Sequence, residues 1–433
     1  MEWLEREFPA IWYRVANSGL CPDTNEGDAM MVAVSKRADA RGDLPRSADV
    51  VIVGGGIVGI ATGWFLAQSG VHPVIVEAAD ELGSRTTAMS AHCIRAQFGE
   101  PDNIRMMAES LEFYESFETR CGGGPGPAGI DLTQQGYLFA STEASDRGPF
   151  EARIRQQAAS GLNDVELLDG ERIRARFPWL SDEIVVGTFR QRDGWIDSAK
   201  AVAGMVSSAD MSILPGTKVE QITVEAGRVT GVQCSAGSIA TETVILAAGP
   251  FSRTLSPEPL PVRLWRRHRV IVAPHPEIPQ DGPVTIDANT GAHWRPHRGG
   301  ALAAWAQPEP DSEPCWPVPT DGQFVERILR SSDGIGRIAP FWRSLAQRLR
   351  TSDITLTAGQ YTMTPDHRPL IGPAPRTHGL YIHTGYSGHG IMGAPSGARI
   401  LTDVILGRSS DNPFDPSRFE GAVASPDVER VVI

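Results

Sequence analysis

The hydrophobic pattern of the chain is sharpest just after Asp49, where residues 50–71 carry no charge. The apolar stretch "VVIVG" predicts a buried strand, "IVGIATGWFLAQSG" predicts a helix that ends at Gly70, and "HPVIVE" predicts a second buried strand. Three consecutive glycines, from Gly54 to Gly56, interrupt the uncharged run between the first strand and the helix. A strand, a tight turn and a buried helix therefore explain this run better than a membrane span.

The rest of the chain mixes helical and strand patterns. A helix that opens at Pro101 is predicted by apolar side chains recurring on one face, namely Ile104, Met107, Leu111, Tyr114 and Phe117. Residues 216–249 predict a β-meander of three or four strands, and residues 261–307 predict further hairpins. Residues 321–350 predict helix, and "LYIHTGYSGHGIMGAPSGARILTDVILG" predicts a last strand, turn and helix. The fold class is therefore α/β (α+β).

Length and composition indicate a globular protein with two domains. A chain of 433 residues is too long for one simple core, and its 41% hydrophobic and 21% charged content is ordinary for a globular protein. Residues 1–48 form an N-terminal extension, in which "MEWLEREFPAIWYRV" predicts a short amphipathic helix and "SKRADARGDLPRSAD" predicts a solvated linker. The charged start of this extension does not fit a signal peptide.

Charge and cysteine usage exclude several classes of protein. The net charge of −12 argues against nucleic acid or an anionic membrane as the main partner. The run Arg266-Arg267-His268-Arg269 is basic, but its apolar flanks at alternate positions favour a strand with one solvated face over an anion site. Five scattered cysteines without a C-x-x-C pair fit neither a disulfide framework nor a zinc site. We expect a protein of a reducing compartment, the cytoplasm, that holds no metal.

A glycine-rich turn between the first strand and the helix carries the first candidate chemistry. Gly54, Gly56 and Gly59 form G-x-G-x-x-G, which allows a tight turn, an approach of backbone to a pyrophosphate, and close packing of the helix. The helix N-terminus adds N–H groups and a positive dipole. Glu77 ends the next strand, where a carboxylate accepts hydrogen bonds from ribose hydroxyls and disfavours NADP. The long loop after Glu77 and the later β-meander favour FAD over NAD.

Five stretches extend this interpretation to most of the chain: "VIVGGGIVGIATGWFLAQSGVHPVIVEA", "GSRTTAMSAHCIRAQFG", "VILAAGPFS", "QYTMTPDHRPLIGP" and "GYSGHGIM". With them the sequence resembles the D-amino acid oxidase (DAO) superfamily of flavoproteins, and within it the sarcosine oxidase and sarcosine oxidase β-subunit branch. The stretches follow the family's order from about residue 49 to residue 408. The resemblance implies a Rossmann-like FAD-binding domain with a β-meander, and a substrate domain with a mainly antiparallel sheet.

The same resemblance implies that both domains are assembled from discontinuous segments. The FAD-binding domain would comprise residues 49–130, 197–260 and 356–433, the last including a tail. The substrate domain would comprise residues 131–196 and 261–355.

Contacts to the cofactor also follow from the resemblance. The loop residues Ser84, Arg85, Thr86 and Thr87 correspond to a loop that touches the diphosphate. Val219 would frame the adenine, and Gly249 would let the chain pass close to the cofactor.

The stretch "GYSGHGIM" corresponds to a loop that passes beside the flavin ring. Gly385, Gly388 and Gly390 would let the backbone lie within hydrogen-bond reach of the ring. The following helix, which starts with Ile391 and Met392, would point its N-terminus at the pyrimidine edge and stabilise the negative charge of reduction. His389 either packs against the cofactor or supports the loop.

Two departures from the family concern the attachment of the flavin. Gly359 stands where some relatives carry a linking cysteine, and Ser90 stands where others carry a linking histidine. His92 and Cys93 lie close by in the sequence. We expect FAD to be held without a covalent bond.

Further departures concern lysines. Met392 replaces a lysine that helps to hold the carboxylate in the small-acid oxidases, which points to a larger or less acidic substrate than sarcosine. The three lysines of the chain are Lys36, Lys200 and Lys218. None falls in residues 261–355, where the lysine that assists oxygen in sarcosine-type oxidases belongs. A pocket Arg or His would supply that charge, or an acceptor other than oxygen would take the electrons.

The implied activity is oxidation of a C–N bond in a secondary or tertiary amine or an N-substituted amino acid, by hydride transfer to flavin N5 that leaves an imine. Arg95 occupies the place of an arginine that binds the substrate carboxylate, and His389 and Tyr361 complete the candidate catalytic set. The candidate aromatic wall of the pocket consists of Trp265, His293, Trp294, Trp305 and Tyr361.

The partners implied are a small-molecule amine and either O₂ or another electron acceptor. A second hypothesis is a flavin-bearing subunit of a multi-chain amine dehydrogenase that passes electrons to a partner subunit. A third is a flavin scaffold without catalytic activity.

Overall fold

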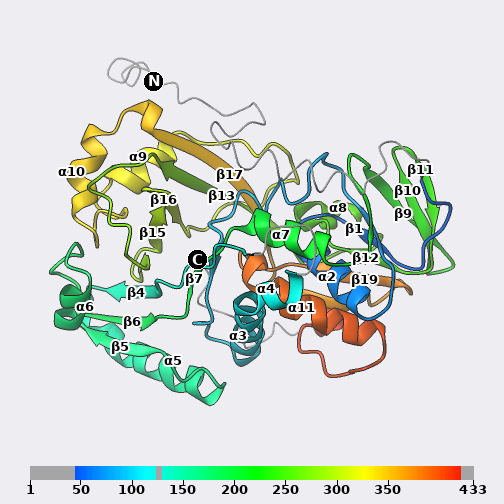
Figure 1. The fold of residues 1–433 in the computed structure, drawn as a ribbon, viewed down its shortest axis with the longest axis horizontal. Coiled ribbons are helices and arrows are strands. Elements are labelled where there is room, and N and C mark those ends of the chain that lie inside the picture. Colours follow the sequence, from blue (N-terminus) through cyan, green and yellow to red (C-terminus); the bar gives the residue numbers. More distant parts are fainter. Residues whose placement is uncertain (1–43, 123–128, 421–433) are drawn as a thin grey trace.

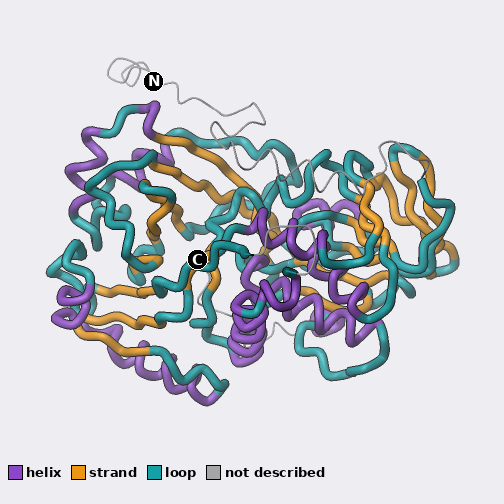
Figure 2. The backbone as a smooth tube through the Cα atoms, viewed as in Figure 1, coloured by secondary structure: helices purple, strands orange, loops and turns teal. Residues whose placement is uncertain are grey.

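The computed structural model describes residues 44–122 and 129–420. The predicted helix at residues 1–15 and most of the predicted linker lie outside the described residues. Two large sheets occupy opposite ends of the molecule in Figure 1, and helices α2, α3 and α11 lie beside the sheet at the right. Figure 2 shows the same division as two groups of strands that are separated by helices and loops.

The first sheet has six strands in the order β18-β19-β12-β1-β2-β8. Its strands are parallel except for the β18–β19 pair. In chain order they are β1 Val51–Val53, β2 Val74–Val76, β8 Ser212–Leu214, β12 Val244–Leu246, β18 Leu370–Pro373 and β19 Leu380–Thr384. The strands β1 and β2 flank helix α2 Ile57–Gln68, as the hydrophobic pattern predicts. Parallel strands joined by a helix form the expected Rossmann-like unit.

Helices cover this sheet with apolar surface. Helix α2 carries no charged residue and packs against α11 Gly390–Ile405 and α7 Ser198–Ser207. Helix α3 Pro101–Glu115, opened by its predicted proline, packs its apolar face on α11 and is followed by α4 Phe117–Cys121. These helices and the inner strands share one hydrophobic core.

A three-stranded antiparallel sheet forms the predicted meander. It consists of β9 Val219–Glu225, β10 Arg228–Cys234 and β11 Gly237–Ala240. The turn between β9 and β10 has positive φ at Ala226 (49°) and Gly227 (76°), as two-residue hairpins require. Ser47 forms a bridge to Ala240 at the edge of β11, so the backbone of the last linker residues is paired while Arg46 and Ser47 stay exposed.

The second sheet has eight strands in the order β17-β13-β16-β15-β14-β4-β6-β5. All neighbours are antiparallel except β14 and β4, which are parallel. The strands are β4 Tyr137–Ser141, β5 Glu166–Asp169, β6 Val186–Arg190, β13 Arg263–Val272, β14 Val284–Asp287, β15 Ala292–His297, β16 Gly300–Trp305 and β17 Ile354–Met363. The predicted fold class, an α/β unit with a mainly antiparallel second sheet, is confirmed.

Short helices accompany the second sheet. The segment 321–350 forms two helices, α9 Gln323–Arg330 and α10 Phe341–Arg348, instead of one helical stretch. The hydrophobic core of this sheet includes residues of both helices. Helices α5 Arg147–Ala159 and α6 Gly170–Arg176 lie beside β5 and β6. Further short elements are β3 Cys93–Ile94, β7 Gly194–Trp195 and α8 Ser252–Leu255, and the 3₁₀ helices are η1 Ala144–Asp146, η2 Gly249–Phe251, η3 Thr351–Asp353 and η4 Pro416–Phe419.

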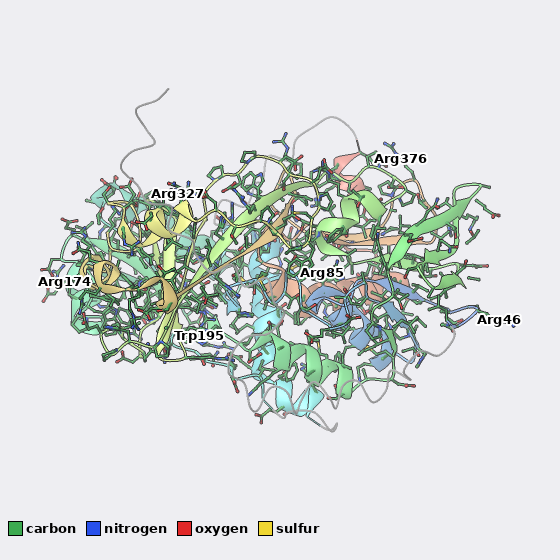
Figure 3. All side chains as sticks on the ribbon, turned by 90° about the horizontal axis from the view of Figure 1, so that it is seen from above. Arg46, Arg85, Arg174, Trp195, Arg327 and Arg376 are labelled. Atoms are coloured by element: carbon green, nitrogen blue, oxygen red, sulfur yellow. The ribbon has the colours of Figure 1, made fainter. Side chains whose placement is uncertain are left out.

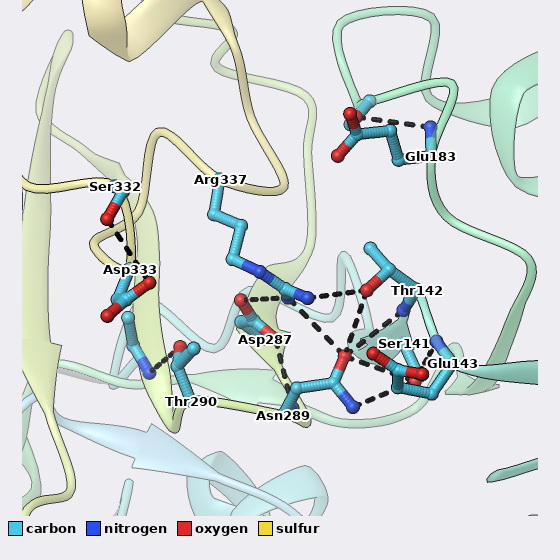
Figure 4. A network of polar contacts seen from close by, with 12 residues as sticks. Ser141, Thr142, Glu143, Glu183, Asp287, Asn289, Thr290, Ser332, Asp333 and Arg337 are labelled. Atoms are coloured by element: carbon cyan, nitrogen blue, oxygen red, sulfur yellow. Dashed lines mark hydrogen bonds and ion pairs between the residues drawn. The ribbon is translucent and has the colours of Figure 1, made fainter. Parts of the chain in front are cut away.

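The seam between β4 and β14 joins two parts of the chain that are far apart in sequence. Buried Asp287 ends β14 and forms an ion pair with Arg337 at 2.7 Å. Arg337 also donates a hydrogen bond to the hydroxyl of Thr142, which follows β4 (Figure 4). Asn289 accepts from the backbone N–H of Thr142 at 3.1 Å. This polar network fastens the seam where the strands end.

The strand β17 bears on the proposed division into domains. Its pairing with β13 extends over all ten residues, so residues 356–363 belong to the eight-stranded sheet although the proposed boundary falls at 355/356. The sequence of this ten-residue strand does not show which sheet it joins, because its partner strand β13 lies some 90 positions earlier in the chain. The remaining boundaries stay a proposal.

Candidate active site

A cavity of about 870 Å³ lies between the two large sheets. One end is lined by the turn after β1, by the end of β2, by the loop 83–87 and by residues 218–220, 247–251, 254 and 255. The other end is lined by residues of β13, β15, β16 and β17, while the loop 89–95 and the start of α11 run along its side. Arg85, a lining residue, is labelled near the middle of the molecule in Figure 3.

The turn after β1 and the start of α2 have glycines at two positions where a side chain would collide with neighbouring backbone. Gly54 has φ of +112°, and a Cβ atom there would lie 2.5 Å from the carbonyl oxygen of Ala247. Gly56 precedes α2 as its N-cap and lines the cavity. Gly59 does not line the cavity; a Cβ atom there would lie 1.9 Å from the carbonyl oxygen of Gly54. Gly54 and Gly59 thus leave no room for a side chain in the turn and at the helix, while the approach of Gly56 to a pyrophosphate stays a prediction.

Glu77 lies at the cavity wall directly after β2. Its carboxylate accepts hydrogen bonds from the backbone N–H of Gly55 at 2.6 Å and of Ala79 at 2.7 Å. These two donors fix the carboxylate beside the glycine turn. It is therefore placed where an acceptor for ribose hydroxyls is expected.

The loop 84–87 brings its four predicted residues to the cavity. Thr87 accepts a 3.1 Å hydrogen bond from the backbone N–H of Ile57, the first residue of α2. Ser84, Arg85 and Thr86 line the same wall. The guanidinium of Arg85 lies 5.3 Å from the ring centre of Phe251, and its buried Nε has no hydrogen-bond partner among the described residues.

Val219 and Gly249 line the same end of the cavity. Gly249 has φ of +54°, and nothing in the described chain lies within 4 Å of a Cβ atom built there. The open space beside Gly249, the N-terminus of α2 with glycine as its N-cap, and the orphaned Nε of Arg85 together fit a dinucleotide such as FAD.

The loop before α11 is shaped by its glycines. Gly388 has φ of +95°, and a Cβ atom there would lie 2.2 Å from Cε2 of Tyr361. Gly385 has φ of +74° but does not line the cavity, because it faces Thr364 and Leu370. Ser387 donates its backbone N–H to the carbonyl of Thr362 at 2.9 Å. The loop therefore lies tightly against the end of β17.

A buried chain of hydrogen bonds ties this loop to α2. Nε2 of His383 lies 2.7 Å from the hydroxyl of Tyr386, and its Nδ1 lies 2.8 Å from Oγ1 of Thr62 in α2. Burial lowers the pKa of His383 to about 3, so the imidazole is neutral. Tyr114 of α3 donates to the carbonyl of Ile391 at 2.7 Å. Both contacts hold the start of α11, where Gly390, Ile391 and Met392 line the cavity.

His389 lies between the loop and the cavity, and its contact with the cofactor stays a prediction. It is 3% exposed, lines the cavity and packs edge-on against Phe98 at 5.1 Å. Burial, followed by the nearby charge of Arg95, lowers the pKa of His389 to about 3. Its buried Nε2 has no hydrogen-bond partner in the described chain. A neutral ring with one unmatched nitrogen fits a residue that supports the loop and contacts a ligand.

The far end of the cavity contains Arg95, Tyr361, His293 and Trp305. Arg95 is 3% exposed, donates to the carbonyl of Gln97, and lies 3.8 Å from the ring centre of Phe98. Burial raises the pKa of Tyr361, so its hydroxyl is protonated. Burial lowers the pKa of His293 to about 4, and its Nδ1 lies 2.9 Å from the carbonyl of Gly291.

Two expected wall residues do not line the cavity. Trp294 follows His293 on β15 and therefore faces the opposite side of the sheet. There it packs on Phe341 at 5.5 Å and Trp342 at 5.7 Å. Trp265 also lies outside the lining, with the guanidinium of Arg267 at 5.2 Å from its ring centre.

The basic run on β13 is the main feature that the sequence interpretation missed. The predicted strand is present, but its predicted solvated face is wrong, because Arg267 and Arg269 line the cavity. Arg269 donates to the carbonyls of Ala88 at 2.8 Å and Ser90 at 2.6 Å, which fastens the loop 88–92 to the sheet. The alternation of Arg267 and Arg269 could have indicated a shared face, but not which face meets the cavity.

Other lining residues also had no predicted contact role. Tyr137 lines the cavity, and burial raises the pKa of its hydroxyl. The segment 314–318 adds Trp316, which is 40% exposed. No group of His, Cys, Asp and Glu residues that could hold a metal occurs in residues 44–122 or 129–420. Within these ranges, no helix is long and apolar enough to cross a membrane.

Comparison with known proteins decides the family. The sequence profile of the DAO family, described as FAD dependent oxidoreductase, matches residues 49–404. The chain belongs to the DAO family. Its cofactor is FAD, and the predicted family and cofactor are both confirmed.

Relatives within this family are similar over most of the chain. FAD-dependent oxidoreductase domain-containing protein 1 from Xenopus laevis is 28% identical, with 84% of this chain and 80% of that protein covered. Mitochondrial dimethylglycine dehydrogenase from Rattus norvegicus is 24% identical over 85% of this chain, but the match spans only 44% of that enzyme. The expected cytoplasmic location stays a prediction.

Among solved structures, L-proline dehydrogenase from P. horikoshii has a TM-score of 0.76 and 24% identity. The similarity covers 87% of this chain and 99% of that one, and it supports the fold described above.

Proposed function

We propose that this FAD-dependent oxidoreductase oxidises a C–N bond in a secondary or tertiary amine or an N-substituted amino acid. Bound FAD supplies a two-electron acceptor for the hydrogen that leaves the substrate carbon, and the substrate becomes an imine. O₂ or another acceptor then takes the electrons. Similarity to dimethylglycine dehydrogenase supports an N-substituted amino acid as the substrate class.

The observation that carries this proposal is buried Arg95 at the end of the cavity opposite the dinucleotide turn. A guanidinium in a dry site attracts a carboxylate through charge-assisted hydrogen bonds. Stacking on Phe98 restricts the guanidinium to one orientation. Arg95 would therefore bind the acid group and fix the amine relative to the flavin.

The ionisation of the surrounding residues favours an unprotonated amine. Glu77 and Glu220 are the two carboxylates among the described lining residues, and both lie at the dinucleotide end. The groups beside Arg95 are the neutral imidazoles of His293 and His389 and the protonated phenol of Tyr361. A fixed cation disfavours a second cation at this end of the cavity, where no carboxylate of the described lining lies. The amine lone pair is then free to form the C=N bond as hydride leaves.

No residue needs to remove a proton in this scheme. Tyr361 and His389 would act by shape and hydrogen bonding, holding the amine between the loop before α11 and β17. Catalysis would consist mainly of positioning and exclusion of water.

The test is an anaerobic screen of amines and N-substituted amino acids against the FAD-loaded single chain. The proposal predicts that at least one of them bleaches the flavin absorbance and yields the aldehyde, keto acid or cyclic imine expected from C–N oxidation. Bleaching by alcohols or hydroxy acids only would contradict it. If the chain takes up FAD but reacts only when another polypeptide is added, the hypothesis of a flavin-bearing subunit replaces that of a self-sufficient enzyme.

A further inference from the structure

A second arginine lies at the same end of the cavity as Arg95. Arg267 is on β13, and its register partner on β17 is Gly359, which has no side chain to cover the guanidinium. The ring centres of Trp265 and Tyr361 lie 5.2 Å and 5.3 Å from the guanidinium carbon. Two aromatic rings therefore hold Arg267 in place at the cavity wall.

The hydrogen bonds of Arg267 leave part of the guanidinium unmatched. Its Nη1 donates to the backbone carbonyls of Arg266 and Gln307. Its Nε is buried and has no partner among the residues that the structure describes. A guanidinium has five N–H donors, so a capacity for charged hydrogen bonds remains.

No salt bridge to Arg267 occurs within the described ranges of the chain. Glu309 is the carboxylate whose charge acts on Arg267, but its ion pair, at 3.8 Å, is with Arg266. Arg267 is therefore a partly buried cation without an ion pair to a described carboxylate. Such a group is costly unless an anion of the ligand satisfies it.

Arg95 and Arg267 face one part of the cavity. His293 and Tyr361 line the same cavity, and the ring centre of Tyr361 lies 5.3 Å from the guanidinium carbon of Arg267. Burial is the largest cause that lowers the pKa of His293, and the charges of both arginines lower it further. The lining carboxylates Glu77 and Glu220 belong to the other end. If the substrate carboxylate pairs with Arg95, as proposed above, no carboxylate of the described lining remains at this end for Arg267.

We propose that Arg267 binds a second anionic group of the substrate, so that the substrate class is a small amine that carries two acidic groups. Arg95 takes one group and Arg267 takes the other, with the amine between them. This inference rests on the proposed function and names its substrate class. It replaces the expectation of a less acidic substrate, which rested on Met392 alone and did not include Arg267.

Binding of unreactive acids to the FAD-loaded enzyme tests this assignment without turnover. The probes are thioethers, which have no amine to oxidise: methylthioacetate with one carboxylate, and thiodiglycolate and (carboxymethylthio)propionate with two. Perturbation of the flavin absorbance gives a Kd for each probe. We expect at least one diacid to bind about 10-fold or more tightly than the monoacid, as one charge-assisted hydrogen-bonded pair allows.

Variants assign the preference to Arg267. Arg267→Met should remove the diacid preference while changing the Kd of methylthioacetate by no more than about two-fold, and Arg267→Lys should restore part of the preference. Arg327→Met is the matched control, because Arg327 is an exposed arginine on α9 outside the cavity lining. The ratio of flavin to protein absorbance reports whether each variant still folds around FAD.

Two results would overturn the assignment. Equal affinity of the wild type for monoacid and diacids shows that no second anion site exists. Equal weakening of all probes in Arg267→Met shows that Arg267 shares one carboxylate with Arg95. If amines bleach the flavin but the diacid preference is absent, this inference fails alone. If the diacid preference is present but no amine bleaches the flavin, the proposed function fails and the anion site remains.

Discussion

Gly388 and Tyr361 lie so close that a single added carbon atom would bring them into collision. A Cβ atom at Gly388 would be 2.2 Å from Cε2 of the tyrosine ring, and the backbone there has φ of +95°. The loop before α11 and the end of β17 thus fit together only because residue 388 is glycine. Through this contact, β17 sets the position of the loop before α11, which is expected to lie beside the flavin.

Gly388→Ala should therefore displace the loop and weaken FAD binding. We expect the purified variant to contain less than half of the wild-type FAD, measured as the ratio of flavin to protein absorbance, roughly the effect of losing 1–3 kcal/mol to a clash and a strained φ. Gly407→Ala is the control: its φ is +66°, but nothing described lies within 4 Å of the added carbon. Full FAD content in Gly388→Ala would show that the loop does not depend on this contact.

The polar network at the seam of the eight-stranded sheet predicts a large loss of stability. Arg337→Met leaves the fully buried carboxylate of Asp287 without its cation, which should cost about 3–5 kcal/mol. Arg348→Met breaks the exposed pair with Glu277 and should lower the free energy of unfolding far less, because water screens that pair. Urea unfolding followed by far-UV circular dichroism compares the two variants. The double variant Asp287→Asn/Arg337→Met should recover part of the lost free energy of unfolding, because it has no unpaired buried charge. If it recovers none, the loss in Arg337→Met comes from packing and not from the charge of Asp287.

Stability should fall on acidification because buried histidines stay neutral in the folded protein. The pKa values of His293 and His389 are lowered from 6.5 to about 4 and about 3, with burial as the largest cause. The unfolded chain binds these protons at higher pH than the folded chain does. The stabilisation is therefore fully present above pH 6.5 and is lost as the pH falls toward 4 and 3.

Thermal unfolding of wild type and His293→Gln between pH 4 and pH 8 measures this effect. The variant should lose less stability than the wild type over the lower part of the range, by an amount on the order of 2 kcal/mol. Parallel pH profiles of the two proteins would contradict a neutral buried His293.

Part of the fold could be predicted because its signals are local. The strand β1, the glycine turn and α2 are adjacent in sequence, so their pattern contains the whole dinucleotide turn up to Glu77. The side of β13 that meets the cavity could not be predicted in this way, because it depends on how β13 pairs with β16 and β17. His293 and Trp294 are neighbours on β15 and face opposite sides of the sheet, and the sequence does not show which side meets the cavity. Trp294 was therefore wrongly expected in the wall that His293 lines.

Attachment of the flavin is a further prediction. Gly359 and Ser90 both line the cavity and have no atom that could form the bonds seen in relatives, so FAD should be non-covalent. Acid precipitation should release the yellow colour into the supernatant. Colour in the pellet would point to His92 or Cys93, which also line the cavity.

The central claim is that Arg95 positions an acidic amine for oxidation by the cofactor. The most direct measurement is anaerobic stopped-flow reduction of the FAD-loaded enzyme, using the best amino acid of the screen and the same compound with its carboxylate converted to the amide. In the wild type, we predict that the acid reduces the flavin at least about 100-fold more efficiently than the amide, roughly the effect of one buried charge-assisted pair. In Arg95→Met, which should retain FAD, that ratio should fall to near one. A wild-type enzyme that reacts equally with acid and amide, or an Arg95→Met variant that keeps the full preference, would contradict the account.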